Sequence, residues 1–181
     1  MKEVKGYKAF NKDKTNRYGV PFAEGVAYKI DGNVSFGNSG NGFHMCTHLS
    51  DVFRYFDAID DEVLVAEVVG RGDRVKFNDE YEGYYDMYSV REIFIKRFMS
   101  REEVIAHMLN ATEHDVVKFI KTFKMTGDEK IDFLYKFRNN VKVIEHLLYY
   151  QYGYKKVFQE HDGEEKAMRL RLVNEDGQNN C

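Results

Sequence analysis

The spacing of apolar residues changes near residue 98, and the change predicts two kinds of secondary structure along the chain. Before this point, aromatic and aliphatic runs bounded by Gly, Asn and Asp predict strands over residues 4–10, 25–30, 62–70, 74–79 and 90–98. Residues 37–42 (GNSGNG) have the backbone freedom of a loop. Residues 71–74 (RGDR), which lie between two of the strands, predict a hairpin turn.

From residue 100 onward, apolar residues recur with the period of a helix. Ser100 and Glu103 have the spacing of a capping box, and Thr112 is placed to cap a second helix. Asp128 is expected to open a third helix, and residues 141–150 are expected to form a fourth. The stripe that the third helix would bury consists of Ile131, Leu134 and Phe137.

These two patterns predict an α+β fold. We expect a mainly antiparallel sheet domain with one short helix over residues 1–98, a helical bundle packed on it over residues 99–173, and a polar tail over residues 174–181. Folding of 181 residues buries roughly 70% of the surface that the unfolded chain exposes, so the fold needs no metal or disulfide.

Charge and cysteine content narrow the range of functions. The formal net charge of −3 gives no overall attraction to nucleic acid, so contact with nucleic acid is expected to be secondary to contact with protein. No apolar run approaches the roughly 18 residues that cross a membrane, and we expect no membrane partner. One internal thiol, Cys46, and no signal peptide predict a cytoplasmic location.

The segment 43–57 (FHMCTHLSDVFRYFD) allows a metal-site and a structural interpretation. On a strand, His44, Cys46 and His48 would share one face and could present three metal ligands. Structural zinc sites use four ligands at wider spacings, and the sequence has no second cluster of Cys and His. We therefore favour a strand that enters a short helix capped by Ser50, with Cys46 as a small buried apolar residue, and we expect no metal and no cofactor.

The order of these segments resembles two families. The start YKAF, the centre GFHMC and the acidic, aromatic segment SDVFRYFD resemble an uncharacterised phage and bacterial domain over residues 6 to about 108. The same order is distantly similar to the ADP-ribosyltransferase fold. That similarity implies a nicotinamide pocket in which Glu92 would be the catalytic carboxylate, with His44 and Arg17 as supporting groups. The alternative is that Glu92 is a solvent-facing residue of an edge strand.

Two tyrosine-rich segments are candidate binding surfaces. Tyrosine supplies a rigid amphipathic contact area, and carboxylates can pair with a basic partner surface. The aromatic residues and lysines near residue 150 suit a protein interface or the stacking of bases. The predicted binding residues are Tyr81, Glu82, Tyr84, Tyr85, Asp86, Tyr88, Tyr149, Tyr150, Tyr152, Tyr154, Lys155 and Lys156.

Taken whole, the chain resembles the anti-CRISPR proteins of the type II class, which phages and mobile elements carry. The resemblance implies a protein that binds and inhibits the CRISPR effector nuclease of the infected or host bacterium, with or without its guide RNA. An acidic, aromatic surface is complementary to the basic channels of such a nuclease. Two alternatives are a transferase-like enzyme that modifies a host factor and an RNA-cleaving inhibitor that uses His44 as its acid or base.

Overall fold

A computed structural model describes residues 3–37, 40–54, 63–77 and 86–153, together with the backbone of two strands at 155–158 and 170–173. The chain divides into two compact units, Met1–Lys124 and Met125–Cys181. Two helices that the sequence analysis assigned to the helical region, over residues 101–108 and 113–122, therefore belong to the first unit.

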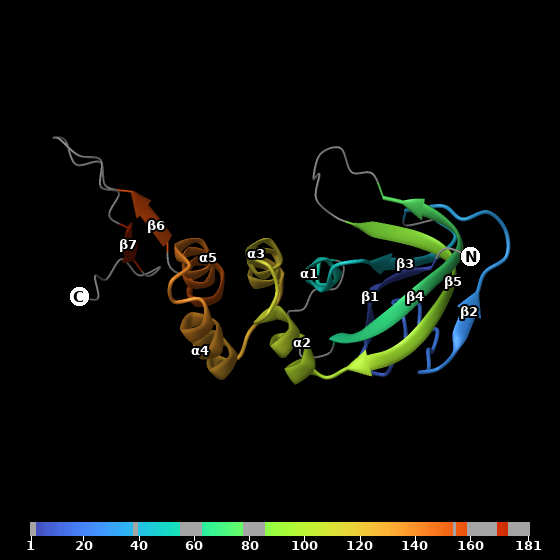
Figure 1. Ribbon diagram of the computed structural model, residues 1–181, viewed down its shortest axis with the longest axis horizontal. Coiled ribbons are helices and arrows are strands. Elements are labelled where there is room, and N and C mark those ends of the chain that lie inside the picture. The colour runs from blue at the N-terminus through green and yellow to red at the C-terminus, as the bar shows by residue number, and fades with distance from the viewer. Residues whose placement is uncertain are drawn as a thin grey trace. The chain divides into compact units, whose positions relative to one another are not determined.

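The first unit is built on an antiparallel sheet, and the predicted α+β fold is confirmed. Its strand order is β2-β5-β3-β1-β4, and β5 also pairs with β4, so the hydrogen-bonded ring β5-β3-β1-β4 closes on itself (Figure 1). The strands are β1 (Val4–Asn11), β2 (Ala27–Lys29), β3 (Phe43–Cys46), β4 (Val63–Lys76) and β5 (Met87–Met99). Phe10, Met45, Val68, Ile93 and Ile95 form the buried core of this sheet.

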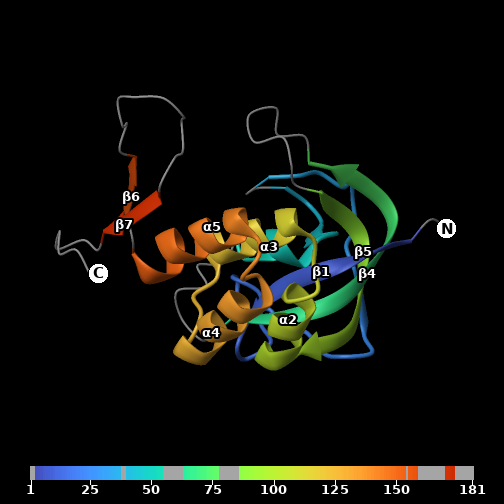
Figure 2. The ribbon, with the colours of Figure 1, turned by 60° about the vertical axis from the view of Figure 1, so that its left-hand side comes forward.

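The long strands β4 and β5 run side by side and curve together (Figure 2). The hairpin turn that residues 71–74 predict is wrong, because β4 passes through this segment as one strand with a register shift between Arg71 and Arg74. Gly72 lies in this irregularity with a φ of 77°, a value that a glycine adopts without strain. The Gly-bearing charged segment therefore forms a bulge and not a turn.

Three helices complete the first unit: α1 (Leu49–Val52), α2 (Arg101–Met108) and α3 (Glu113–Thr122). The capping box of Ser100 and Glu103 at α2 and the Thr112 cap of α3 are confirmed. The predicted Ser50 cap of α1 is wrong: His48 is the N-cap residue, and Ser50 donates a 2.9 Å hydrogen bond to Asp115 at the start of α3. This bond fastens α1 to α3.

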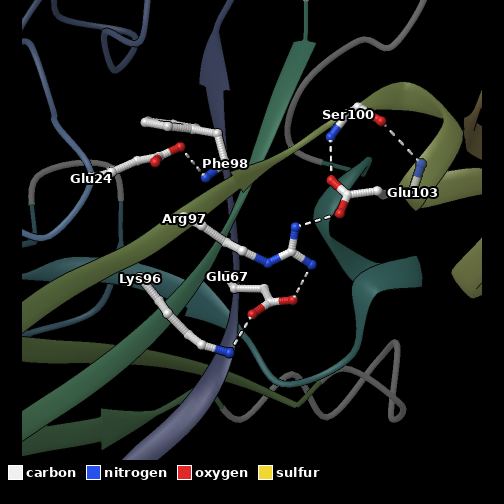
Figure 3. A network of polar contacts seen from close by, with 7 residues as sticks. All are labelled: Glu24, Glu67, Lys96, Arg97, Phe98, Ser100 and Glu103. Atoms are coloured by element: carbon white, nitrogen blue, oxygen red, sulfur yellow. Dashed lines mark hydrogen bonds and ion pairs between the residues drawn. The ribbon is translucent and has the colours of Figure 1, made fainter.

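A network of charged side chains joins the outer face of the sheet to α2 (Figure 3). Glu67 on β4 accepts hydrogen bonds from Lys96 and from Arg97 on β5, at 2.7 and 2.6 Å. Arg97 also donates to Glu103, the residue that closes the capping box with Ser100. Each of the four charged side chains in this network, Glu67, Lys96, Arg97 and Glu103, therefore lies beside an opposite charge.

The second unit contains two helices, α4 (Gly127–Lys136) and α5 (Val141–Tyr152), and a pair of strands, β6 (Lys155–Phe158) and β7 (Leu170–Val173). Thr126 caps α4, where the sequence predicted Asp128. The predicted apolar stripe of this helix is wrong in part: Leu134 and Phe137 are half-buried, but Ile131 is 60% exposed and Phe133, outside the predicted stripe, is fully buried. In the part of the chain that the structure describes, no helix is both long enough and apolar enough to cross a membrane.

Candidate functional site

The first unit contains a cavity of about 190 Å³ beside the contact between β1 and β3. Its walls come from β1, from β3 and from the two loops at residues 16–18 and 36–42. The side chains on which the site depends are Lys8, Arg17, Phe36, Phe43, His44 and Cys46.

The strands β1 and β3 pair at one position, Tyr7 with Cys46, and diverge from there. Gly6 permits this close approach: a Cβ atom at Gly6 would overlap the carbonyl oxygen of Cys46. Beyond the paired position the ladder stops, and Lys8 Nζ donates a 2.9 Å hydrogen bond to the carbonyl oxygen of His44. A lysine side chain thus bridges the two strands where backbone pairing is absent.

Lys8 lies in an apolar environment for a cation. The alternation of β1 places it on the same face as the buried Phe10, and its Nζ atom lies 5.7 Å from the centre of that ring. No carboxylate of a described residue pairs with Lys8. Burial, with a further contribution from the charge of Arg17, lowers the pKa of Lys8 to about 8.

His44 is held as a neutral ring. Burial, followed by the charges of Lys8 and Arg17, lowers the pKa of His44 to about 4. The ring stacks on Phe36 with 4.4 Å between centroids and an interplanar angle of 20°. Its Nε2 atom is buried and has no hydrogen-bond partner among the described residues. A buried polar atom without a partner is uncommon and calls for an explanation, of which a bound ligand is one.

Cys46 is buried, as the sequence predicted, and it is a free thiol. Burial, with the nearby charge of Asp51, raises the pKa of this thiol to about 12. The thiolate is the reactive form of cysteine, so Cys46 contributes an unreactive wall to the cavity. His48 lies elsewhere, with its Nδ1 atom 3.4 Å from Asp115. Among the described residues, no three His, Cys, Asp or Glu side chains are placed to hold a metal ion.

The structure brings together two of the three residues that the similarity to transferases implies. His44 and Arg17 line the cavity, whereas Glu92 does not. Glu92 lies on β5 opposite Lys29 of β2 and Arg71 of β4, and its carboxylate is 3.4 Å from Arg71. Because β5 pairs on both sides, the expectation that Glu92 lies on an edge strand is wrong.

The predicted tyrosine-rich surfaces are only partly described. Asp86 forms an ion pair with Lys76, and Tyr88 packs against the core of the sheet. On α5, Tyr149, Tyr150 and Tyr152 are 51%, 46% and 39% exposed. Four predicted residues of the first segment and one of the second, Tyr81, Glu82, Tyr84, Tyr85 and Tyr154, lie outside the described residues, as do the side chains of Lys155 and Lys156.

Lys8 and Phe36 were not predicted as site residues. A signal for Lys8 was present, because on the strand predicted over residues 4–10 Lys8 shares one face with Gly6 and Phe10. Phe36 precedes the Gly-rich loop and carries no sequence pattern that marks it as a partner of His44.

Comparison with known proteins identifies one family. The family described as "Domain of unknown function (DUF7666)" matches residues 4–107, a segment that contains every residue lining the cavity. No curated protein and no solved structure matches the chain. Because the matched segment is more than half of the chain, this protein belongs to the DUF7666 family.

Proposed function

We propose that the first unit binds a small molecule that carries both an anionic group and a flat aromatic ring. The observation that supports this most strongly is the charge of the cavity wall. Lys8 and Arg17 both line the cavity, and among the described residues that line it there is no Asp or Glu. Cations that face a cavity without a carboxylate favour an anion there, and an arginine is suited to phosphate or carboxylate.

The ring of the ligand has a separate set of contacts. Phe22, Phe36 and Phe43 line the cavity together with the neutral ring of His44. Apolar walls with a few polar groups are typical of small-molecule sites, and flat aromatic surfaces stack on such rings. The unpartnered Nε2 atom of His44 supplies one hydrogen bond that fixes the orientation of the ring.

This proposal assigns binding and no bond-breaking step. Transfer of ADP-ribose needs a carboxylate directed at the reacting sugar. Glu92, the residue implied for that role, is engaged with Arg71 away from the cavity. The transferase alternative would require Glu92→Gln to abolish modification of a host factor, and that variant tests it directly.

Calorimetric titration tests the binding proposal. A panel of nucleoside monophosphates, pyridoxine 5′-phosphate and their uncharged counterparts separates the role of the anion from that of the ring. We expect at least one phosphorylated compound to bind, and its uncharged counterpart to bind roughly tenfold more weakly or worse. Arg17→Ala should weaken only the phosphorylated compound. Lys12→Met, at an exposed lysine outside the cavity, is the matched control. Equal affinity for charged and uncharged compounds would contradict the proposal.

A second proposal keeps the function implied by the resemblance to anti-CRISPR proteins. Three neighbouring tyrosines of α5 are exposed, and exposed aromatic clusters are typical of protein interfaces. We propose that this cluster or the acidic segment 80–88 binds the effector nuclease of a type II CRISPR system and inhibits it. The identity of the partner comes from the resemblance alone.

A DNA cleavage assay with the purified nuclease tests this second proposal. The intact chain should inhibit cleavage in proportion to its concentration, and Tyr150→Ala or Tyr84→Ala should weaken inhibition about tenfold or more, as truncation of interface tyrosines does. Tyr135→Ala is the control, because Tyr135 is 72% exposed on α4 and is not among the predicted binding residues. Absence of inhibition at any concentration would overturn the proposal.

A further inference from the structure

The amine of Lys8 has an unusual set of contacts for a lysine in a protein interior. Its hydrogen-bond acceptor among the described residues is the carbonyl oxygen of His44. An ammonium group has three donors and is costly to bury without an opposite charge, whereas a neutral amine has two donors and a lone pair. The one acceptor is neutral, and the charge of Arg17 also disfavours a protonated Lys8. These surroundings therefore favour the neutral amine over the ammonium form.

We propose that Lys8 is a nucleophile that condenses with an aldehyde or ketone group of the ligand to form a Schiff base. This inference rests on the proposed function, because the anionic group and the ring would hold the carbonyl carbon in the cavity that Lys8 lines. It adds a chemical class to the ligand: an anionic aromatic carbonyl compound.

The state of the amine makes the reaction available near neutral pH. An amine whose pKa is about 8 is neutral in roughly a fifth of molecules at pH 7.4, whereas an ordinary lysine is neutral in about one in a thousand. Lysines that form Schiff bases are activated in this way, by an apolar setting or by a neighbouring cation. Both conditions hold at Lys8, which shares a face with Phe10 and is affected by the charge of Arg17.

The chemical step balances without a further reactant. The lone pair of Nζ forms a bond with the carbonyl carbon, and the carbonyl π electrons move to oxygen, which takes up a proton. The carbinolamine then loses its oxygen as water, and the two hydrogen atoms of that water are those given up by the amine. The product is a C=N bond to Nζ. The hydrogen bond to His44 O fixes Nζ before the attack and leaves its lone pair free.

Reductive trapping tests the proposal. Pyridoxal 5′-phosphate is a suitable probe because it combines a ring, a phosphate and an aldehyde. Incubation of the full chain with this probe and sodium cyanoborohydride, followed by peptide mass mapping, should place saturable labelling on Lys8. Labelling of Lys8 should be at least about tenfold faster than at exposed lysines, because a larger fraction of its amine is neutral. Lys8→Arg should remove this label while Lys12→Arg retains it.

Two further probes separate failure of this inference from failure of the proposed function. Pyridoxine 5′-phosphate has the ring and phosphate without the aldehyde, so it tests binding alone and should protect Lys8. If it binds while Lys8 stays unlabelled, the nucleophile proposal is wrong and the binding proposal stands. Glyoxylate carries an aldehyde and a carboxylate without a ring. Trapping of glyoxylate on Lys8, with no binding of the phosphate compounds, would support the nucleophile and contradict recognition of a ring.

The alternative is that Lys8 only braces the gap between β1 and β3. A brace predicts labelling spread over exposed lysines, with Lys8 spared by both aldehydes, and this result would overturn the proposal. Thermal melting of Lys8→Arg checks that the variant is folded, so that loss of the label reports loss of the amine.

Discussion

Two strand pairs of the closed sheet in the first unit, β4 with β5 and β1 with β3, differ in how they are held together. Along the β4–β5 hairpin, backbone pairing extends from Val65 with Met99 to Lys76 with Tyr88, interrupted by two register shifts. At the β1–β3 junction, pairing is limited to Tyr7 with Cys46. Backbone hydrogen bonds join β4 to β5 along most of their length, whereas a lysine side chain supplies part of the contact between β1 and β3.

The pairing of charged side chains also differs between these two strand pairs. On the hairpin, Glu67 lies between Lys96 and Arg97, and Arg91 pairs with Asp73. At the β1–β3 pairing, the cations of Lys8 and Arg17 line a cavity whose described wall has no carboxylate. Groups that serve stability are matched with their partners inside the fold, whereas groups that bind ligands remain unmatched until the ligand arrives. This difference supports the proposal that the cavity beside the β1–β3 pairing binds a ligand.

The largest expected change in the free energy of unfolding comes from a core residue of the β4–β5 hairpin. It tests whether this hairpin contributes most to the stability of the first unit. Ile93 on β5 is fully buried in the core, so Ile93→Ala removes three methyl or methylene groups and leaves a cavity. We expect a loss of about 3 kcal/mol in the free energy of unfolding, measured by urea denaturation. Val75→Ala is the control on the same hairpin, because Val75 is 38% exposed, and it should cost less than about 1 kcal/mol. Similar losses of free energy of unfolding in both variants would contradict the prediction that the buried side of the hairpin stabilises the first unit.

The next largest change in stability is expected at Gly6, which lies against Cys46 where β1 pairs with β3. In Gly6→Ala, the new Cβ atom would overlap the Cys46 carbonyl oxygen and crowd the Met45 side chain at 2.8 Å. Because backbone must move to relieve the overlap, we expect a loss of about 2 kcal/mol in the free energy of unfolding. Gly127→Ala is a matched control, since a Cβ there meets nothing within 4 Å, and it should be neutral or slightly stabilising. An unchanged Gly6→Ala variant would show that the strands are already further apart.

The fold was predictable wherever local chemistry decides the outcome. The capping box at Ser100 and the Thr112 cap depend on side chains three residues from their partners, and both predictions are confirmed. The turn predicted at residues 71–74 failed because the same Gly-Asp signal fits a bulge when β5 runs alongside to pair with it. The prediction that α4 buries Ile131 was wrong. The sequence allows an apolar stripe with Ile131 or one with Phe133, and tertiary packing buries Phe133.

The site was less predictable than the fold. His44 and Arg17 were implied by a resemblance, and the structure places both in one cavity. Lys8 was missed because its neutral surroundings arise from the separation of β1 from β3, which involves residues 36 positions apart in sequence. Burial of Cys46 was predicted from its residue type and is confirmed. A sequence shows which side chains are present, but unmatched charge becomes visible only after the partners of all neighbours are known.

A smaller effect tests the matched charges of the hairpin. Hydrogen bonds from Lys96 and then from Arg97 lower the pKa of Glu67 below its ordinary value. We expect Glu67→Gln to cost about 1 kcal/mol at pH 7, as a networked surface ion pair does. Since the folded-state pKa is the lower one, this contribution is present above the unfolded-state value of about 4.3 and is lost as pH falls through the folded-state pKa.

Denaturation of both proteins between pH 7 and pH 3 measures this contribution. The difference between wild type and Glu67→Gln should be constant down to about pH 5 and should shrink below that. Glu92→Gln is the control, because the ion pair of Glu92 with Arg71 is longer, at 3.4 Å, and the variant should have a smaller effect. A difference that grew on acidification would contradict the assignment.

The smallest expected effect has the opposite sign and is the sharpest test of the junction. Lys8→Met keeps the length of the side chain and removes an amine whose pKa is lowered by burial. A lysine with a lowered folded-state pKa destabilises the fold below that pKa, and the penalty is relieved as pH rises from about 8 toward the unfolded-state value of about 10.4. Lys8→Met should therefore raise the free energy of unfolding by about 0.5 kcal/mol at pH 7, after loss of the hydrogen bond to His44, and the gain should decline above pH 8. Denaturation at pH 7 and pH 9, with Lys12→Met as control, measures both the gain and its decline. A clear loss of stability at pH 7 would mean that Lys8 is required to join β1 to β3, and the contrast between a matched hairpin and an unmatched junction would fail.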